Sequence, residues 1–202
     1  MNENGNTQSY TPEEIPRQAP PPKKKPGFFA DLLQFILISI FIVLPIRLFI
    51  AQPFIVSGAS MEPTFESGNY LIVDQLSYHF EKPSRGTVVI FKYPKDPTKF
   101  FIKRIIGLPS ETIEINDSKV TIKNDANPEG LVLNEPYIKY PKTDFLSVKL
   151  DNDEYFVMGD NRAGSSDSRI WGALSEELII GRPFIRLLPP SKISFFPGSY
   201  NE

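Results

Sequence analysis

Residues 57–64 read SGASMEPT, and they place Ser60 in a segment whose composition favours a tight turn. The small residues before Ser60 let the backbone bend and let a second chain approach closely, while Pro63 restricts the chain just after it. A hydroxyl held beside free backbone N–H groups suits acyl transfer, because those groups can stabilise an oxyanion as it forms. Taken alone, the segment is more typical of an ordinary Ser/Gly/Pro turn.

A lysine lies in the apolar run FFIKRIIGLP at residues 100–109. If the run is a strand, its side chains alternate, so Lys103 shares a face with Phe101 and Ile105 while Arg104 takes the other face. Apolar neighbours make the charged amine costly, which lowers its pKa and favours the neutral form that a general base needs. The alternative is a strand-edge lysine whose stem is buried and whose amine lies in water.

A third segment, MGDNRAGSSDSRIWG at residues 158–172, is too polar for a core and too rich in donors and acceptors for a plain linker. Asn, Asp and Ser side chains can cap backbone groups and hold such a loop rigid. A rigid polar loop could orient the amine of a base, as the third member of a catalytic triad does. A solvent-exposed turn is the alternative.

The composition removes most other catalytic devices. The chain has no cysteine, which excludes disulfides, thiolate nucleophiles and Cys-bound zinc and leaves the redox compartment open. His79 is the single histidine, so a His-based metal site lacks ligands, and a Ser-His-Asp triad would have to use this residue. Its mixed polar and aromatic surroundings favour a loop or strand-edge histidine instead. We therefore expect no metal and no other cofactor, and the formal net charge of −2 gives no reason to expect a nucleic-acid partner.

The N-terminal part of the chain has a different composition from the rest. Residues 1–26 are rich in Pro, Gln, Asn and Glu and cannot bury enough apolar surface to fold, so we predict a disordered tail. Residues 27–50 are long and apolar enough to form a transmembrane anchor, and their few polar side chains lie near the ends, where they can reach lipid headgroups. A buried core helix is the alternative, but apolar residues cover every face of the segment.

Three lysines at residues 23–25 precede the predicted anchor, and the positive-inside rule then puts the N-terminus in the cytoplasm. Residues 51–202 would form an extracytoplasmic domain at the cell membrane. A cleaved signal peptide is the competing interpretation, since residues 57–59 read SGA, a small-x-small pattern. Its n-region would be unusually long, and cleavage there would leave Ser60 at a new N-terminus.

Beyond residue 50, short apolar runs alternate with turns that contain Pro and Gly. This pattern predicts a mainly β domain, a partly open antiparallel β-barrel or sandwich. Residues 123–153 are polar and turn-rich, which indicates a ribbon or loop excursion rather than a second domain. The predicted strands are residues 70–73, 87–91, 100–106, 112–115, 120–123, 155–158 and 178–180.

Together these segments resemble the type I signal peptidases, the bacterial leader peptidases of the Ser–Lys class. The resemblance covers the predicted anchor and nearly all of residues 45–190. It rests on the approach to the serine at 47–64, the strand RGTVVIF at 85–91, the lysine segment, and the polar segment with its GDNR and DSRIWG motifs, all in the family's order. It implies the same architecture, a mainly β catalytic domain behind a single N-terminal transmembrane helix.

The resemblance also implies a role for each residue of the site. Ser60 matches the nucleophile, Lys103 matches the general base, and Ser165 matches the hydroxyl that orients the lysine amine. Asp167 and Arg169 match an ion pair that supports the site. The backbone N–H of Ser60 would form half of the oxyanion hole.

The chain departs from the family pattern at few positions. In some members a serine two positions before the nucleophile supplies the second oxyanion donor, whereas Gly58 stands here and implies a backbone N–H instead. Ser110 stands where the family often has Gly. Ala163 and Gly164 replace the usual Asp-Asn, which leaves fewer caps for the polar loop. The large insertion of some members is missing.

The implied activity is that of a membrane-bound serine endopeptidase that removes signal peptides from exported preproteins. Its partners would be those signal peptides, membrane lipid and the nearby secretion translocon. The substrate would bind extended beside residues 55–58 and 100–103 and add a strand to the sheet. Shallow apolar pockets would select small residues at the first and third positions before the cut. By family position, the pocket walls are Val56, Met61, Phe65 and Ile102.

Two other functions fit the sequence less well. A self-cleaving repressor-type Ser–Lys peptidase would need a DNA-binding half, whereas a polar tail and an apolar span precede this domain. A catalytically silent, membrane-anchored β module that binds exported peptides would be indicated by a changed serine or lysine. Both Ser60 and Lys103 are intact, which favours the enzyme.

Overall fold

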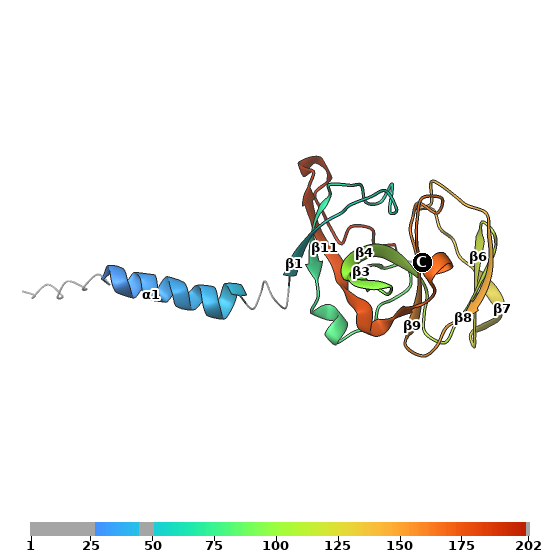
Figure 1. Ribbon diagram of the computed structural model, residues 1–202, viewed down its shortest axis with the longest axis horizontal. Helices are drawn as coiled ribbons and strands as arrows, with labels where there is room; N and C mark the ends of the chain where they lie inside the picture. Colours follow the sequence, from blue (N-terminus) through green and yellow to red (C-terminus); the bar gives the residue numbers. More distant parts are fainter. Residues whose placement is uncertain (1–26, 45–50, 201–202) are drawn as a thin grey trace, which may run out of the picture. The chain divides into compact units, whose positions relative to one another are not determined.

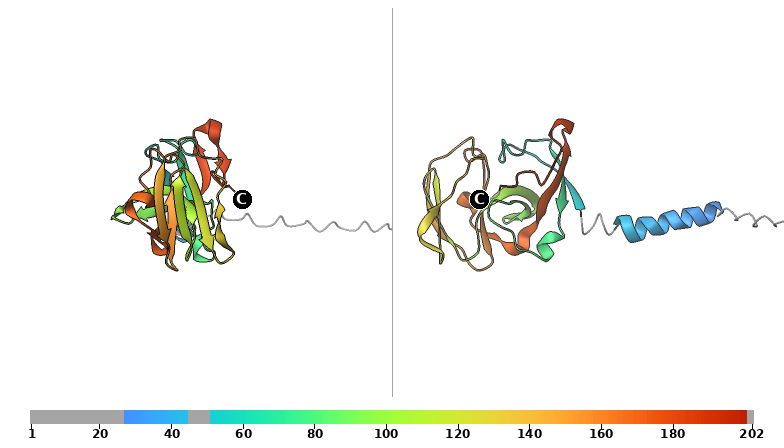
Figure 2. Two further views of the ribbon diagram at one scale, coloured as in Figure 1. Left: turned by 90° about the vertical axis from the view of Figure 1, so that its right-hand side faces the viewer. Right: turned by 180° about the vertical axis from the view of Figure 1, so that it is seen from behind.

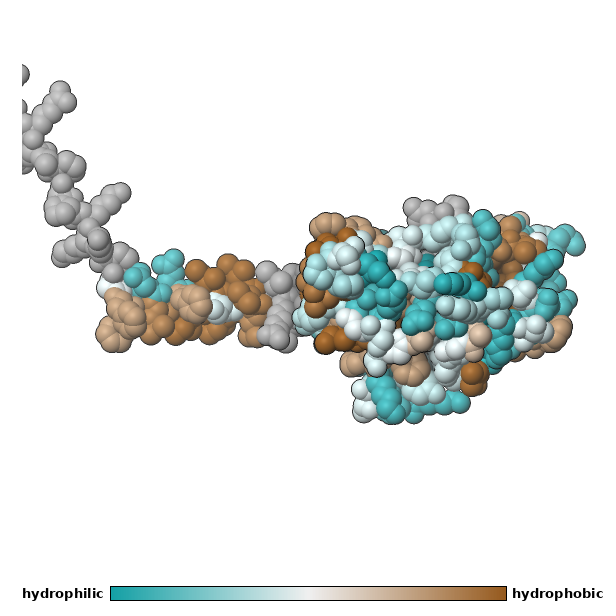
Figure 3. Space-filling view, turned by 90° about the horizontal axis from the view of Figure 1, so that it is seen from above, coloured by the Kyte–Doolittle hydropathy of each residue, from teal (hydrophilic) through white to brown (hydrophobic). Residues whose placement is uncertain are grey.

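The computed structural model describes residues 27–44 and 51–200. Its first helix, α1 (Phe28–Ile38), is followed in the chain by the π-helical turn η1 (Ser39–Val43) (Figure 1), and the large apolar side chains of both are exposed (Figure 3). No helix within the described ranges is both long enough and apolar enough to cross a membrane. The predicted tail, 1–26, and the end of the predicted anchor, 45–50, lie outside the described residues, so both segments stay predictions.

An eight-stranded antiparallel sheet forms the larger part of the fold beyond residue 50. Its strands run in the order β1-β2-β11-β3-β4-β9-β10, and β12 pairs with β11. Since the end strands β1 and β10 do not pair, the sheet does not close into a barrel within residues 51–200. Its strands are β1 (Ala51–Ile55), β2 (Tyr70–Asp74), β3 (Val88–Tyr93), β4 (Asp96–Gly107), β9 (Glu154–Met158), β10 (Leu174–Ser175), β11 (Ile179–Leu188) and β12 (Ser194–Phe195).

A four-stranded antiparallel sheet in the order β7-β6-β5-β8 lies beside the larger one (Figures 1 and 2). Its strands are β5 (Thr112–Asp117), β6 (Lys119–Asn124), β7 (Asn127–Val132) and β8 (Asp144–Lys149). Alternation in β5 and β6 puts every second side chain on the inner face, where it meets the ends of β4 and β9. The resulting apolar cluster joins the two sheets and consists of Ile106, Ile113, Ile115, Val120, Ile122, Leu133, Leu150, Phe156 and Met158.

The second half of β4 is the best-covered strand segment near the motifs. β4 lies between β3 and β9, and its residues 103–107 are all buried. Successive strand residues point to opposite faces, so a run of consecutive buried residues shows that both faces of β4 are covered. Lys103 and Arg104 therefore both point into the interior, although they point in opposite directions.

The prediction of a mainly β, antiparallel domain is confirmed, and each predicted strand overlaps one of the observed strands. Five strands were missed: β1, β7, β8 and the two-residue strands β10 and β12. The strand β7 contains Pro128 and Gly130, residues typical of turns, and β8 exposes every second side chain. Because neither strand carries a buried apolar run, residues 123–153 looked like a ribbon or loop, whereas they supply both edges of the four-stranded sheet.

Phe156 supplies a test of the cluster that joins the sheets, because its side chain is 0% exposed. We expect Phe156→Ala to lower the free energy of unfolding by about 3–5 kcal/mol, through lost burial and a cavity. Phe80 is 83% exposed, so Phe80→Ala should change the free energy of unfolding by no more than about 0.5 kcal/mol. Urea denaturation of the two purified variants measures both, and equal losses would contradict the core position of Phe156.

Candidate active site

The structure brings together the serine and the lysine that the sequence singled out. Ser60 lies in the loop between β1 and β2, and Lys103 lies in the buried half of β4. A hydrogen bond of 2.7 Å joins the Lys103 Nζ to the Ser60 Oγ. The same amine donates to the carbonyl of Ile102 at 2.9 Å. This is the geometry in which an amine can take a proton from a hydroxyl.

Burial sets the ionisation of the Lys103 amine. The side chain is 3% exposed, and none of the ion pairs in the described part of the chain includes it. Loss of hydration lowers its pKa from the ordinary 10.5 to about 8, although the carboxylates of Asp167 and Asp160 act in the opposite direction. About a tenth of the amine is therefore neutral near pH 7, without any rearrangement.

An apolar groove opens beside Ser60, with a volume of about 530 Å³. One wall is the chain at residues 54–60, and the other is β4 at residues 99–103. Of the predicted pocket residues, Val56 and Ile102 line this groove. Met61 and Phe65 lie behind the wall instead, buried in the apolar cluster that also contains Val56.

Ser165 is buried, but the hydrogen bond to the lysine amine that the family pattern implies is absent. Its Oγ has no hydrogen-bond partner within the described residues. The loop that carries it nevertheless packs tightly on the serine loop through Gly159. A Cβ on Gly159 would lie 2.3 Å from both the Ser165 Oγ and the Ser60 carbonyl oxygen. Only glycine permits this approach.

The predicted pair of Asp167 and Arg169 is present and holds the polar loop. Two hydrogen bonds of 2.8 Å run from the guanidinium to the carboxylate, and the carboxylate also accepts the Gly159 N–H at 3.0 Å. Burial raises the pKa of Asp167, but Arg169 outweighs it and holds that pKa below its ordinary value. Asp167 also caps the short helix α2 (Ser168–Trp171), so this pair fixes the loop at Gly159.

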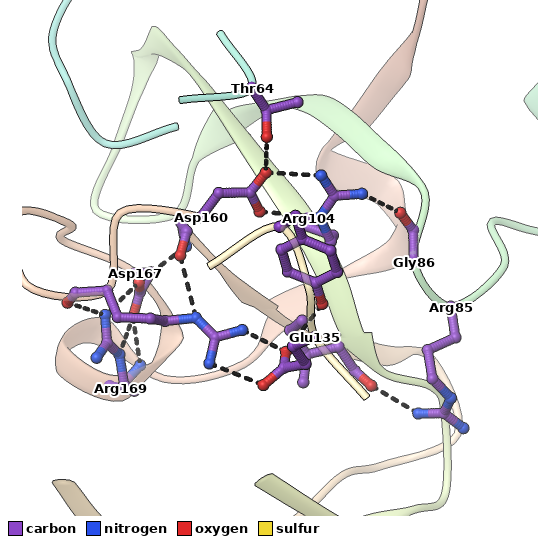
Figure 4. Close-up of polar contacts among 12 residues, drawn as sticks. Thr64, Arg85, Gly86, Arg104, Glu135, Asp160, Asp167 and Arg169 are labelled. Atoms are coloured by element: carbon purple, nitrogen blue, oxygen red, sulfur yellow. Dashed lines mark hydrogen bonds and ion pairs between the residues drawn. The ribbon is translucent and has the colours of Figure 1, made fainter. Parts of the chain in front are cut away.

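A second buried ion pair, between Arg104 and Asp160, has no counterpart among the predicted site residues (Figure 4). Arg104 is 1% exposed and donates two hydrogen bonds to the carboxylate, at 2.8 and 2.6 Å. Thr64 donates to the same carboxylate at 2.5 Å. Strand alternation gave the only available signal, since it put Arg104 opposite Lys103 in an apolar run, where a charge requires a partner.

The remaining guanidinium donors of Arg104 reach two distant backbone carbonyls. The Arg104 Nη1 donates at 2.6 Å to Gly86 and at 2.6 Å to Gly198, and the ring of Tyr137 lies 4.0 Å from the Arg104 Cζ. Arg104 therefore connects β4 with the loop before β3 and with the C-terminal segment.

Gly58 and His79 complete the set of residues named from the sequence. Gly58 lines the groove, and its φ of 93° is a conformation that suits glycine. The Ser60 N–H has no hydrogen-bond partner among the described residues. His79 ends a 3₁₀ turn, η3 (Ser77–His79), and its Nδ1 bonds to the carbonyl of Gln75 at 3.0 Å.

Burial of the charged Lys103 amine should lower the free energy of unfolding, and Lys103→Met tests this. A pKa lowered from 10.5 to about 8 corresponds to a penalty of at most about 3 kcal/mol. For a lysine the full penalty applies below pH 8 and disappears between pH 8 and 10.5. We therefore expect Lys103→Met to raise the free energy of unfolding near pH 7 and to lose this advantage near pH 10.5.

Urea denaturation at the two pH values measures this effect. Lys119 is exposed at the start of β6, so Lys119→Met is the matched control and should change little at either pH. A gain for Lys103→Met that is the same at both pH values would contradict a charged-amine penalty.

Comparison with known proteins gives one consistent result. The family model of the signal peptidases, peptidase S26, matches residues 29–188. A signal peptidase I of Leptolyngbya laminosa is 35% identical over an alignment of 206 positions, gaps included. The alignment covers 95% of this chain and 97% of the relative. A probable signal peptidase I-1 of Synechocystis is 35% identical over 172 residues, which cover 82% and 85%.

A solved structure was found as well. It is the crystal structure of a signal peptidase I from Enterococcus faecalis, 28% identical, with a TM-score of 0.44 over 50% of this chain and 97% of that chain. The family model spans more than half of this sequence, and the two relatives cover most of its length. The chain therefore belongs to the signal peptidase family, peptidase S26, and is a serine peptidase.

Proposed function

We propose that this chain removes signal peptides from exported preproteins, with Ser60 as nucleophile and Lys103 as general base. The observation that carries the proposal is the 2.7 Å hydrogen bond between the Lys103 Nζ and the Ser60 Oγ, next to an apolar groove. The lowered pKa of Lys103 supports the role of base. Membership in the signal peptidase family supports signal peptides as the substrates.

Acylation begins with transfer of the Ser60 hydroxyl proton to the neutral Lys103 amine. The Ser60 Oγ attacks the scissile carbonyl carbon, and the carbonyl oxygen becomes an oxyanion that the Ser60 N–H can stabilise. The tetrahedral intermediate then expels the amine of the mature protein. The Lys103 ammonium returns its proton to that amine, which leaves an ester between Ser60 and the signal peptide.

Deacylation repeats the same proton transfers with water. Neutral Lys103 takes a proton from water, and the hydroxide attacks the ester carbonyl. The Ser60 oxygen leaves and recovers the proton from Lys103, which restores the enzyme and releases the signal peptide as a carboxylic acid. One base thus serves both half-reactions, and neither half-reaction requires a metal or an organic cofactor.

The groove suits an extended apolar peptide with small side chains near the cut. We propose that the peptide lies between residues 55–58 and 100–103, with Val56 and Ile102 against its side chains. Met61 and Phe65 would support the pocket wall without lining it, because they belong to the buried cluster against which Val56 packs. Their bulk keeps the pockets shallow, which favours small residues at the first and third positions before the cut.

The orienting role of Ser165 is also part of the proposal. Its Oγ is buried and without a partner in the described part of the chain, so it has free hydrogen-bonding capacity beside the serine loop. Asp167 and Arg169 would support the site by fixing the loop on which Ser165 lies.

We further propose that residues 27–50 anchor the chain in the cell membrane and that the catalytic domain lies on the extracytoplasmic side. The lysines at 23–25 and the apolar character of the segment support this orientation. An anchored domain would meet signal peptides at the membrane surface near the translocon, where the cleavage site emerges.

The dyad is tested with a preprotein in detergent and the purified full chain. We expect Ser60→Ala and Lys103→Arg to lower kcat/KM by about 10³-fold or more, because the first lacks the nucleophile and the second cannot become neutral near pH 7. The matched controls are Ser118→Ala, in the exposed turn after β5, and Lys119→Arg, at the exposed start of β6. Both should cleave as the wild type does. Normal cleavage by either dyad variant would disprove the dyad, whereas a wild type that does not cleave would leave the peptide-binding module.

The pH dependence of kcat/KM tests the base separately. Only the neutral amine is active, and the pKa of Lys103 is lowered to about 8. The rate should therefore rise about tenfold per pH unit below pH 8 and level off above it. Initial rates across that range measure the inflection, and a rate that falls as the pH rises through 8 is incompatible with Lys103 as the base.

A further inference from the structure

We infer that Asn161 is a positioning residue that aims the Ser60 N–H into the groove as an oxyanion donor. This inference rests on the proposed function. Asn161 contacts two consecutive carbonyls of the serine loop. Its backbone N–H donates to the Ser60 carbonyl at 3.1 Å, and its side-chain Nδ2 donates to the Ala59 carbonyl at 3.0 Å.

The second contact matters because of peptide geometry. The Ala59 carbonyl and the Ser60 N–H belong to one planar peptide unit, in which the C=O and N–H bonds point in opposite directions. Holding the oxygen on one side therefore fixes the direction of the N–H on the other side. A hydrogen bond to the carbonyl also polarises the unit and strengthens its N–H as a donor.

One other contact reaches this peptide unit within the described residues, a hydrogen bond of 3.2 Å from the Glu62 N–H to the same Ala59 carbonyl, and it comes from inside the serine loop itself. The preceding Gly58 adopts a φ of 93°, and a Cβ added there would meet no atom within 4 Å. The Ser60 N–H itself donates to none of the groups in residues 27–44 and 51–200. Without the contact from Asn161, only this turn within the serine loop would hold the unit, and the turn and the unit could rotate together and carry the N–H away from the groove.

Asn161 is itself held in one orientation. Its Oδ1 accepts the Gly164 N–H at 2.9 Å, so the Nδ2 is the atom that faces Ala59, and a flipped amide would lose both contacts. Gly164 packs closely on this amide, since a Cβ at that position would lie 2.9 Å from the Nδ2. The amide is therefore fixed before substrate binds.

Asn161→Asp is the sharpest test, because it keeps the size and the acceptor for Gly164. It replaces the donor to Ala59 with an oxygen that repels the carbonyl. We expect kcat to fall about 10- to 100-fold, somewhat less than the loss of a whole oxyanion donor. KM should stay within about twofold, since the groove is unchanged. The two enzymes are compared on the plateau of the pH profile, because an added carboxylate raises the pKa of Lys103 as Asp167 and Asp160 do.

A transition-state mimic gives a second readout. A substrate-sequence peptide aldehyde forms a tetrahedral adduct with the serine, whereas the matching peptide alcohol cannot. Asn161→Asp should weaken inhibition by the aldehyde about as much as it lowers kcat and should leave inhibition by the alcohol unchanged. Asn134→Asp is the control, because its amide is exposed and reaches only the Tyr200 hydroxyl, at 3.3 Å.

The outcomes separate this inference from the proposed function. If the wild type cleaves the preprotein and Asn161→Asp keeps its kcat, or loses aldehyde and alcohol binding equally, the positioning role is wrong. A general loss of stability, seen as a lower Tm with a raised KM, would likewise make Asn161 a structural residue only. If the wild type does not cleave at all, the proposed function itself fails.

Discussion

The carboxylate of Asp160 is the point at which the serine, lysine and polar segments of the site meet. It accepts hydrogen bonds from Arg104, which is next to Lys103 in the chain, and from Thr64, which lies four residues after Ser60. Asp160 in turn lies between Gly159, which packs on the serine loop, and Asn161. Since a buried charge without its partner costs about 3–5 kcal/mol, the three segments hold one another in register, and the distance between the Ser60 hydroxyl and the Lys103 amine follows from that register.

Two adjacent basic residues on β4, Lys103 and Arg104, have opposite surroundings. Arg104 has a carboxylate, two carbonyls and an aromatic ring around it, so its guanidinium is fully paired and contributes to structure. Lys103 has a hydroxyl, one carbonyl and apolar surface, so its charge is disfavoured. Strand alternation alone separates the two environments. The fold thus uses one strand to fix a permanent charge on one face and to prepare a neutral amine on the other.

Several features could be predicted because they depend on local pattern. The strand around Lys103, the small residues before Ser60 and the polar character of residues 158–172 all follow from residue types and spacing. The contacts of Asn161 could not be predicted, since they depend on which carbonyls a distant loop presents. Met61 and Phe65 were expected in the groove, whereas they lie behind its wall, because chain position does not tell a lining residue from a supporting one. The free Oγ of Ser165 likewise depends on side-chain rotation, which the sequence does not encode in any short pattern.

The place of β11 has a consequence for the order in which the protein can be made. This strand, residues Ile179–Leu188, lies between β2 and β3 in the sheet, and the Gly198 carbonyl beyond it completes the shell around Arg104. Both follow the serine, the lysine and the polar loop in the chain. The sheet that presents the serine and the lysine therefore has a gap until residues 179–198 have been synthesised, and such long-range pairing is slow to form. A nascent chain thus cannot assemble its site segment by segment.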